Sequence, residues 1–223
     1  MTFKLSPSIL TLMEECPRCF WLNFHGKKRP EGIFSSLPSG MDGILKKHFD
    51  KFMENEKLPP ELRECPECKG MKLFDDADLL KEWRNNFKGI SCTDKEGNIL
   101  HGAVDNILIK GKKLIVLDYK TRGYPLKEDT AAHYQNQLNF YNFLLRKNGY
   151  ETEDYAFLLF YIPREVKETG EVIFDTKLIK MKINVSEAEK IWKRALKLLS
   201  GPCPSKHDEA QDRCAWCELL GME

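Results

Sequence analysis

Three charged residues lie at the end of an apolar run that is typical of a buried strand. Asp118 and Lys120 stand two positions apart after the run 114–117. Because side chains alternate along a strand, both project from the same face. Asp105 belongs to the preceding predicted strand, 103–109, and a short turn at 110–111 brings it to the same end of the sheet. Two carboxylates that converge there repel each other unless a divalent cation lies between them, and oxygen ligands suit Mg²⁺ or Mn²⁺.

Lys120 determines what reaction the two aspartates and a bound cation could catalyse. Beside a bound cation, Lys120 would orient a water molecule and stabilise negative charge that develops on a phosphate. The alternative interpretation is a solvated ion pair at a strand end, because Asp-x-Lys is a common tripeptide. The buried character of the strand favours a functional role, since charged groups at the end of such a strand are costly without one.

The periodicity of the apolar residues predicts an α/β fold, with a central mixed sheet flanked by helices. Both faces of the two central strands are apolar, as expected for a sheet that is covered on each side. The segment 26–40 is predicted to be an exposed loop. Helices are predicted from Ser6 towards Phe24, over 42–53, 77–86 and 129–147, and from a capping box at Ser186 onward; further strands are predicted over 155–162 and 172–183.

The length and composition bound the class of protein. With 223 residues and 42% hydrophobic side chains, the chain can bury a core, which excludes intrinsic disorder. We expect one domain over 1–223, with its core at about 40–185, a polar insert at 54–72 and cysteine-bearing terminal regions at 1–25 and 200–223. The net charge of +1, from 35 basic and 34 acidic side chains, excludes a uniformly basic coat but not a local basic groove.

No segment is predicted to enter a membrane. The longest apolar run, 155–162, falls far short of the ~18 residues that a spanning helix needs. Lys4, Glu14 and Glu15 accompany the N-terminal apolar stretch, which excludes a secretory signal peptide. We therefore expect a cytoplasmic protein.

Six of the eight cysteines form Cys-x-x-Cys pairs, at Cys16/Cys19, Cys65/Cys68 and Cys214/Cys217. In a reducing compartment this spacing indicates metal binding or redox chemistry. The first and last pairs together would supply four ligands to one site and join the two ends of the chain. The set Cys16, Cys203, Cys214 and Cys217 is an alternative. No second pair accompanies Cys65 and Cys68.

Four motifs, in this order and spacing, resemble the RecB-like branch of the PD-(D/E)XK nuclease superfamily. They are Gly43-x-x-x-x-His48, Gly102-Ala103-Val104-Asp105, Leu117-Asp118-Tyr119-Lys120-Thr121 and Gln137-x-x-x-Tyr141. The resemblance implies a restriction-endonuclease-like core. It also implies that Asp105 and Asp118 are metal ligands and that Lys120 is the catalytic lysine.

The resemblance implies further roles for residues around this group. His48 would be a third metal ligand and the backbone carbonyl of Tyr119 a fourth, whereas the apolar stripe around His48 on its own favours a packed core histidine. Gln137 and Tyr141 lie one helical turn apart and would shape the site. An imidazole ligand would favour Mn²⁺ over Mg²⁺.

The activity implied by the resemblance is that of a metal-dependent deoxyribonuclease. Hydrolysis of the phosphodiester would occur on single-stranded DNA ends or flaps, in CRISPR adaptation or recombination repair. No G-x-x-x-x-G-K-[ST] loop occurs in the sequence, so a helicase or a CRISPR integrase is a possible partner. The alternatives are a catalytically silent nucleic-acid-binding module and a metal-structured adaptor.

The resemblance also bears on the cysteines. CRISPR-associated RecB-like exonucleases carry one cysteine before the core and three after it, and these hold a [4Fe–4S] cluster. This sequence departs from that pattern, because a close pair stands on each side of the core. A zinc site with four cysteine ligands is therefore a competitor of the cluster.

Overall fold

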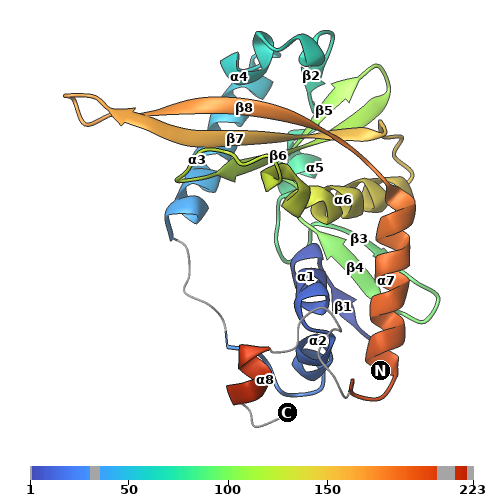
Figure 1. The fold of residues 1–223 in the computed structure, drawn as a ribbon. Coiled ribbons are helices and arrows are strands. Elements are labelled where there is room, and N and C mark those ends of the chain that lie inside the picture. The colour runs from blue at the N-terminus through green and yellow to red at the C-terminus, as the bar shows by residue number, and fades with distance from the viewer. Residues whose placement is uncertain (1, 31–35, 205–213, 220–223) are drawn as a thin grey trace.

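A five-stranded mixed sheet forms the centre of the computed structural model, which describes residues 2–30, 36–204 and 214–219. Its order is β2 (Lys72–Leu73), β5 (Asn106–Lys110), β6 (Lys113–Thr121), β7 (Tyr155–Val166) and β8 (Val172–Lys182) (Figure 1). All neighbours are antiparallel except β6 and β7. A smaller sheet has the order β1 (Lys4–Leu5), β4 (Ile99–Gly102) and β3 (Ile90–Thr93). The predicted α/β class is confirmed.

Strand β6 shows why helices cover both faces of the larger sheet. Leu114 and Val116 belong to one hydrophobic cluster, which includes residues of α6 (Gln135–Lys147). Ile115 and Leu117 belong to a second cluster, which includes residues of α3 (Ser36–Glu54) and α4 (Pro60–Arg63). The alternation of a strand thus directs apolar side chains into two separate cores.

The helix between β6 and β7 makes their parallel pairing possible, because parallel neighbours need a crossover. The crossover begins with the 3₁₀ helix η2 (Thr130–Tyr134) and continues as α6, so the single helix predicted over 129–147 is two elements. Helix α7 (Val185–Ser200) packs along α6. Its cap is Asn184, which accepts a hydrogen bond from the backbone of Glu187, and not Ser186 as predicted.

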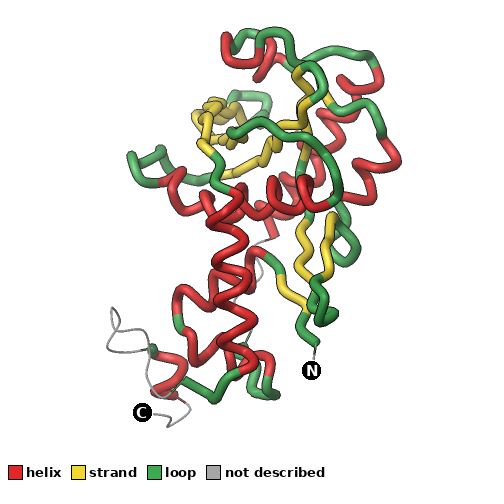
Figure 2. Tube along the Cα trace, turned by 90° about the vertical axis from the view of Figure 1, so that its right-hand side faces the viewer, coloured by secondary structure: helices red, strands yellow, loops and turns green. Residues whose placement is uncertain are grey.

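The N-terminal helix is also divided. Helices α1 (Pro7–Glu15) and α2 (Pro17–Phe24) meet at Cys16, whose extended backbone has a φ of −159°. Proline disfavours a helical conformation in the residue before it, which explains the break. Helix α8 (Ala215–Leu219) lies beside α2 at the same end of the molecule, as Figures 1 and 2 show from two sides.

Two segments are more ordered than their sequence patterns suggest. Helix α3 starts at Ser36, inside the segment predicted to be an exposed loop. The polar insert 54–72 contains α4 and the 3₁₀ helix η1 (Pro66–Cys68), and Leu62 and Cys68 are buried against the sheet.

Helix α5 (Ala77–Trp83) ends earlier than predicted. Within the described ranges, no helix has the length and apolar character that a membrane crossing requires.

Candidate active site and cysteine cluster

Asp105 and Asp118 face each other at the end of the β5–β6 pair. Asn106 pairs with Leu117, so one further step along the ladder sets Asp105 across from Asp118. Asp105 precedes β5 rather than lying within a strand as predicted. Its Oδ2 accepts a hydrogen bond of 2.9 Å from the backbone N–H of Tyr119. The Nε of Arg84 donates to its carbonyl oxygen over 2.7 Å. The position of Asp105 is therefore fixed from two sides.

Lys120 links Asp118 to helix α6. Its Nζ lies 2.5 Å from Oδ2 of Asp118 and donates to Oε1 of Gln137 over 3.0 Å. The Nε2 of Gln137 donates in turn to the hydroxyl of Tyr141 over 2.8 Å. The ammonium also lies 4.6 Å from the ring centre of Tyr134. The structure thus brings four of the residues singled out by the sequence into one connected chain of polar contacts.

Helix α3 contributes two residues that the sequence analysis missed. The Nζ of Lys46 lies 2.7 Å from Oδ2 of Asp42 and 3.1 Å from Oδ1 of Asp105. The two residues stand four positions apart on one helix, a spacing that ordinarily indicates a solvated ion pair. Only the packing of α3 against the sheet distinguishes this pair from a solvated one.

His48 lies in a different environment from the two aspartates. Its Nε2 is 3.0 Å from Oε1 of Glu61, which also accepts a hydrogen bond from Tyr161. The imidazole ring makes edge contacts with Phe49 and Phe52. In the described part of the chain, His48, Asp105 and Asp118 do not bring three ligand atoms within 4.8 Å of one another. The role of His48 as a metal ligand stays a prediction.

Burial makes the two aspartates unusually basic. It raises the pKa of Asp118 to about 7, with the charge of Asp105 adding to the effect and Lys120 opposing it. Burial likewise raises the pKa of Asp105, against the opposing charge of Lys46. Two buried carboxylates whose charges repel each other are a donor set that a divalent cation would stabilise, and their oxygen atoms fit Mg²⁺ or Mn²⁺.

The comparisons with known proteins bear on this geometry. A family model described as the PD-(D/E)XK nuclease superfamily matches residues 4–221. The chain belongs to this superfamily. Among solved structures, the crystal structure of SSO0001 covers 91% of this chain and 79% of its own, with 15% sequence identity and a TM-score of 0.45. No curated protein matches the sequence.

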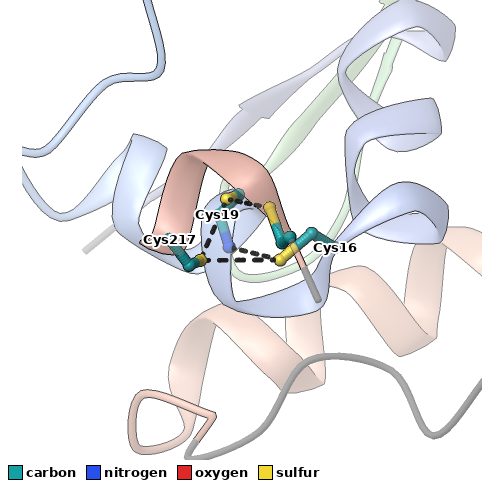
Figure 3. Close-up of side chains that lie close together, drawn as sticks. Cys16, Cys19 and Cys217 are labelled. Carbon is teal, nitrogen blue, oxygen red and sulfur yellow. Dashed lines mark hydrogen bonds between the residues drawn. The ribbon is translucent and has the colours of Figure 1, made fainter. Parts of the chain in front are cut away.

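This PD-(D/E)XK protein also contains a buried cluster of four cysteines. Cys16, Cys19, Cys214 and Cys217 have all their sulfur atoms within 4.8 Å of one another. The Sγ of Cys19 lies 3.5 Å from that of Cys214 and 3.4 Å from that of Cys217, and Cys16 is 3.9 Å from Cys217 (Figure 3). The structure thus brings together the two Cys-x-x-Cys pairs that were predicted from the sequence to supply one metal site.

Backbone hydrogen bonds and a nearby cation favour a thiolate at Cys214, whereas burial raises the pKa of Cys19 and raises that of Cys217 to about 11. Burial disfavours the thiolate of Cys214, but hydrogen bonds from the backbone of Cys217 and Trp216 outweigh it and lower its pKa to about 6. Arg29 donates to the same sulfur over 3.5 Å. Cys16 caps α2 and accepts from the backbone N–H of Cys19 over 3.4 Å. Such thiolates are suitable metal ligands.

The other cysteines lie outside this cluster. The Sγ of Cys203 contacts the carbonyl oxygen of Pro204, so the alternative ligand set is not the one assembled. The Sγ of Cys65 donates to Glu67 over 2.9 Å, and Cys68, which also belongs to the insert, is buried in the second hydrophobic cluster. Cys92 packs against the larger hydrophobic cluster, as expected for a small apolar residue.

Proposed function

We propose that this chain is a divalent-metal-dependent deoxyribonuclease that hydrolyses phosphodiester bonds. The observation that carries the proposal is the pairing of Lys120 with the buried carboxylate of Asp118, 2.5 Å away, at the strand end that also holds Asp105. A buried pair of this kind is costly to maintain, and the resemblance to the RecB-like branch implies that it serves catalysis. Single-stranded ends or flaps are the proposed substrate, because the four ordered motifs resemble the RecB-like branch.

The residues of the site have distinct proposed roles. Asp105 and Asp118 hold a Mg²⁺ or Mn²⁺ ion, with the Tyr119 carbonyl and His48 as further ligands implied by the resemblance. Such an ion, when bound, neutralises charge on the phosphate and lowers the pKa of a water molecule. Lys120 donates towards the negative charge that develops on the scissile phosphate. Gln137, held by Tyr141, keeps the Lys120 ammonium in place.

A cleavage assay with a matched lysine control tests this proposal. End-labelled single-stranded DNA, flaps and duplexes are incubated with Mn²⁺ or Mg²⁺ and the full chain. Lys120→Met should lower the rate at least about 100-fold, the usual cost of removing a donor that stabilises transition-state charge. Lys180→Met is the control, because Lys180 also lies over an aromatic ring, 3.9 Å from that of Tyr155, but on strand β8. An inert parent protein on every substrate would contradict the proposal.

The cleavage assay with added partners, together with a DNA-binding assay, distinguishes the remaining roles. Cleavage that depends on a helicase or on a CRISPR integrase would identify the partner, since the chain contains no nucleotide-binding loop of the G-x-x-x-x-G-K-[ST] type. Tight binding of DNA by a folded but inert protein would favour the nucleic-acid-binding module instead.

We propose Zn²⁺ as the metal of the cysteine cluster. Four sulfurs bound to one tetrahedral Zn²⁺ at about 2.3 Å lie about 3.8 Å apart. The measured separations of 3.4, 3.5 and 3.9 Å agree with this value. In a [4Fe–4S] cluster each cysteine binds a different iron, so its ligand sulfurs lie about 6 Å apart. The observed spacing therefore supports a single ion over the cluster.

Metal analysis of protein purified without oxygen tests the zinc proposal. A colourless sample with one zinc per chain is expected, and Cys19→Ser should lose the metal whereas Cys92→Ser should keep it. A strong chelator should then lower the melting temperature of the parent protein. A brown sample with broad visible absorbance and four irons per chain would overturn the assignment.

A further inference from the structure

Lys46 occupies a central position between two carboxylates of the proposed metal site. Its Nζ contacts Oδ2 of Asp42 at 2.7 Å and Oδ1 of Asp105 at 3.1 Å. The side chain is 20% exposed, and that of Asp105 is 16% exposed. The ammonium is thus a positive charge held between two oxygen ligands, which is the place that a cation bound by both would need.

The carboxylates of the site outnumber the ammonium groups that contact them. Asp42, Asp105 and Asp118 supply three carboxylates, and Lys46 and Lys120 supply the two ammonium groups that contact them. The ammonium of Lys120, on strand β6, donates to Gln137 of α6, whereas Lys46 extends from helix α3. The ammonium of Lys46 therefore competes with any cation for these oxygens.

The spacing of the carboxylates agrees with such competition. Oxygen ligands of one Mg²⁺ lie about 2.1 Å from the ion, and so within about 4.2 Å of one another. Within the described residues, Asp42, Asp105 and Asp118 do not bring three oxygens within even 4.8 Å of one another. The ammonium of Lys46 lies between the first two. Closing the site around an ion thus requires that Lys46 moves away.

We infer that Lys46 is a built-in counter-ion that a divalent cation displaces on binding, and that Asp42 is the carboxylate ligand released by this displacement. The inference rests on the proposed function. It adds Asp42 to the ligands proposed above, because Asp42 shares with Asp105 the ammonium to be replaced. Its side chain is 43% exposed and so has room to move.

Binding of Mn²⁺ to the full chain, without DNA, tests the inference separately from catalysis. The dissociation constant is measured from the spectrum of free Mn²⁺ by electron paramagnetic resonance. Lys46→Met should bind Mn²⁺ about tenfold more tightly, because removing one partner of a partly buried ion pair leaves carboxylate charge that the metal can then compensate. Asp42→Asn should bind at least about tenfold more weakly, since a charged ligand is lost.

Glu189→Gln is the matched control, because it removes the carboxylate of another i,i+4 ion pair, the one with Lys193 at 3.0 Å on α7, and it should leave Mn²⁺ affinity unchanged. Equal or weaker binding by Lys46→Met, or unchanged binding by Asp42→Asn, would overturn the inference.

The design also separates this inference from the proposed function. If Lys46→Met does not fold without metal, Lys46→Gln keeps a polar group without the charge, and Mn²⁺ should raise its melting temperature more than that of the parent. An equal rise in both proteins would contradict the role of Lys46. A parent chain that binds no Mn²⁺ at all would instead contradict the metal-dependent function itself.

Discussion

Replacing Asp118 with asparagine should flatten the dependence of folding stability on pH. The Asp118 side chain is 2% exposed, and burial together with Asp105 raises its pKa from 3.8 to about 7. Between these values the unfolded chain has released this proton while the folded protein keeps it. Stability is therefore lost as pH rises through this window and is constant above it.

The size of the effect follows from the shift. At about 1.4 kcal/mol for each pKa unit, a change from 3.8 to about 7 corresponds to about 4 kcal/mol, of which about 3 kcal/mol falls between pH 5 and pH 8. Asp118→Asn removes this contribution. Lys120 keeps its contacts with Gln137 and Tyr134.

Urea denaturation at intervals between pH 5 and pH 8, without added divalent cations, measures this difference. The free energy of unfolding of the parent should fall by about 3 kcal/mol more than that of Asp118→Asn. Asp175→Asn is the control, because it removes a carboxylate that is 57% exposed, and it should follow the parent. Parallel curves for the parent and Asp118→Asn would refute the reasoning, since they would mean that Asp118 is ionised in the folded protein at ordinary pH.

Two other substitutions probe the packing behind the site. Gly102→Ala would bring a methyl group to 2.8 Å from the ring of Tyr141, and should cost about 1–3 kcal/mol of stability in thermal or urea unfolding; an unchanged stability would show that the ring has room to move. Tyr141→Phe removes the hydroxyl that accepts a hydrogen bond from Gln137. This variant should cleave DNA about tenfold more slowly while its Mn²⁺ affinity stays as in the parent. Weaker Mn²⁺ binding would place Tyr141 among the metal contacts instead.

The parts of the site that lie on one strand or one helix were predictable from sequence. Asp118 and Lys120 share a face because strand side chains alternate, and this needs no knowledge of the rest of the fold. Gln137 and Tyr141 share a helical face for a similar reason. The two cysteine pairs were predictable because one tetrahedral metal needs four ligands. Each of these predictions depends on local geometry or on simple coordination chemistry.

Residues that reach the site through packing were not predictable in this way. Asp42 and Lys46 have the spacing of an ordinary surface pair, and only the contact of α3 with the sheet brings Lys46 to Asp105. Arg84 stands at the end of a short helix and reaches the Asp105 carbonyl across 21 positions of sequence. The helix boundaries were predicted wrongly for a different reason: the apolar pattern continues across Pro17, a local break signal, and across η2.

The two proposed metals have separable effects because they lie at different ends of the molecule. Strand β6 lies in the larger sheet, and α8 lies at the far end beside α2 (Figures 1 and 2). Helices α1 and α2 pack against α7, which packs against α6, the helix that carries Gln137. Loss of the cysteine-bound metal should therefore reduce cleavage only as far as it unfolds the protein. Loss of Mn²⁺ should abolish cleavage in a fully folded chain. A chelated protein that stays folded but no longer cleaves after Mn²⁺ is restored would show that the cysteine cluster acts on the chemistry itself.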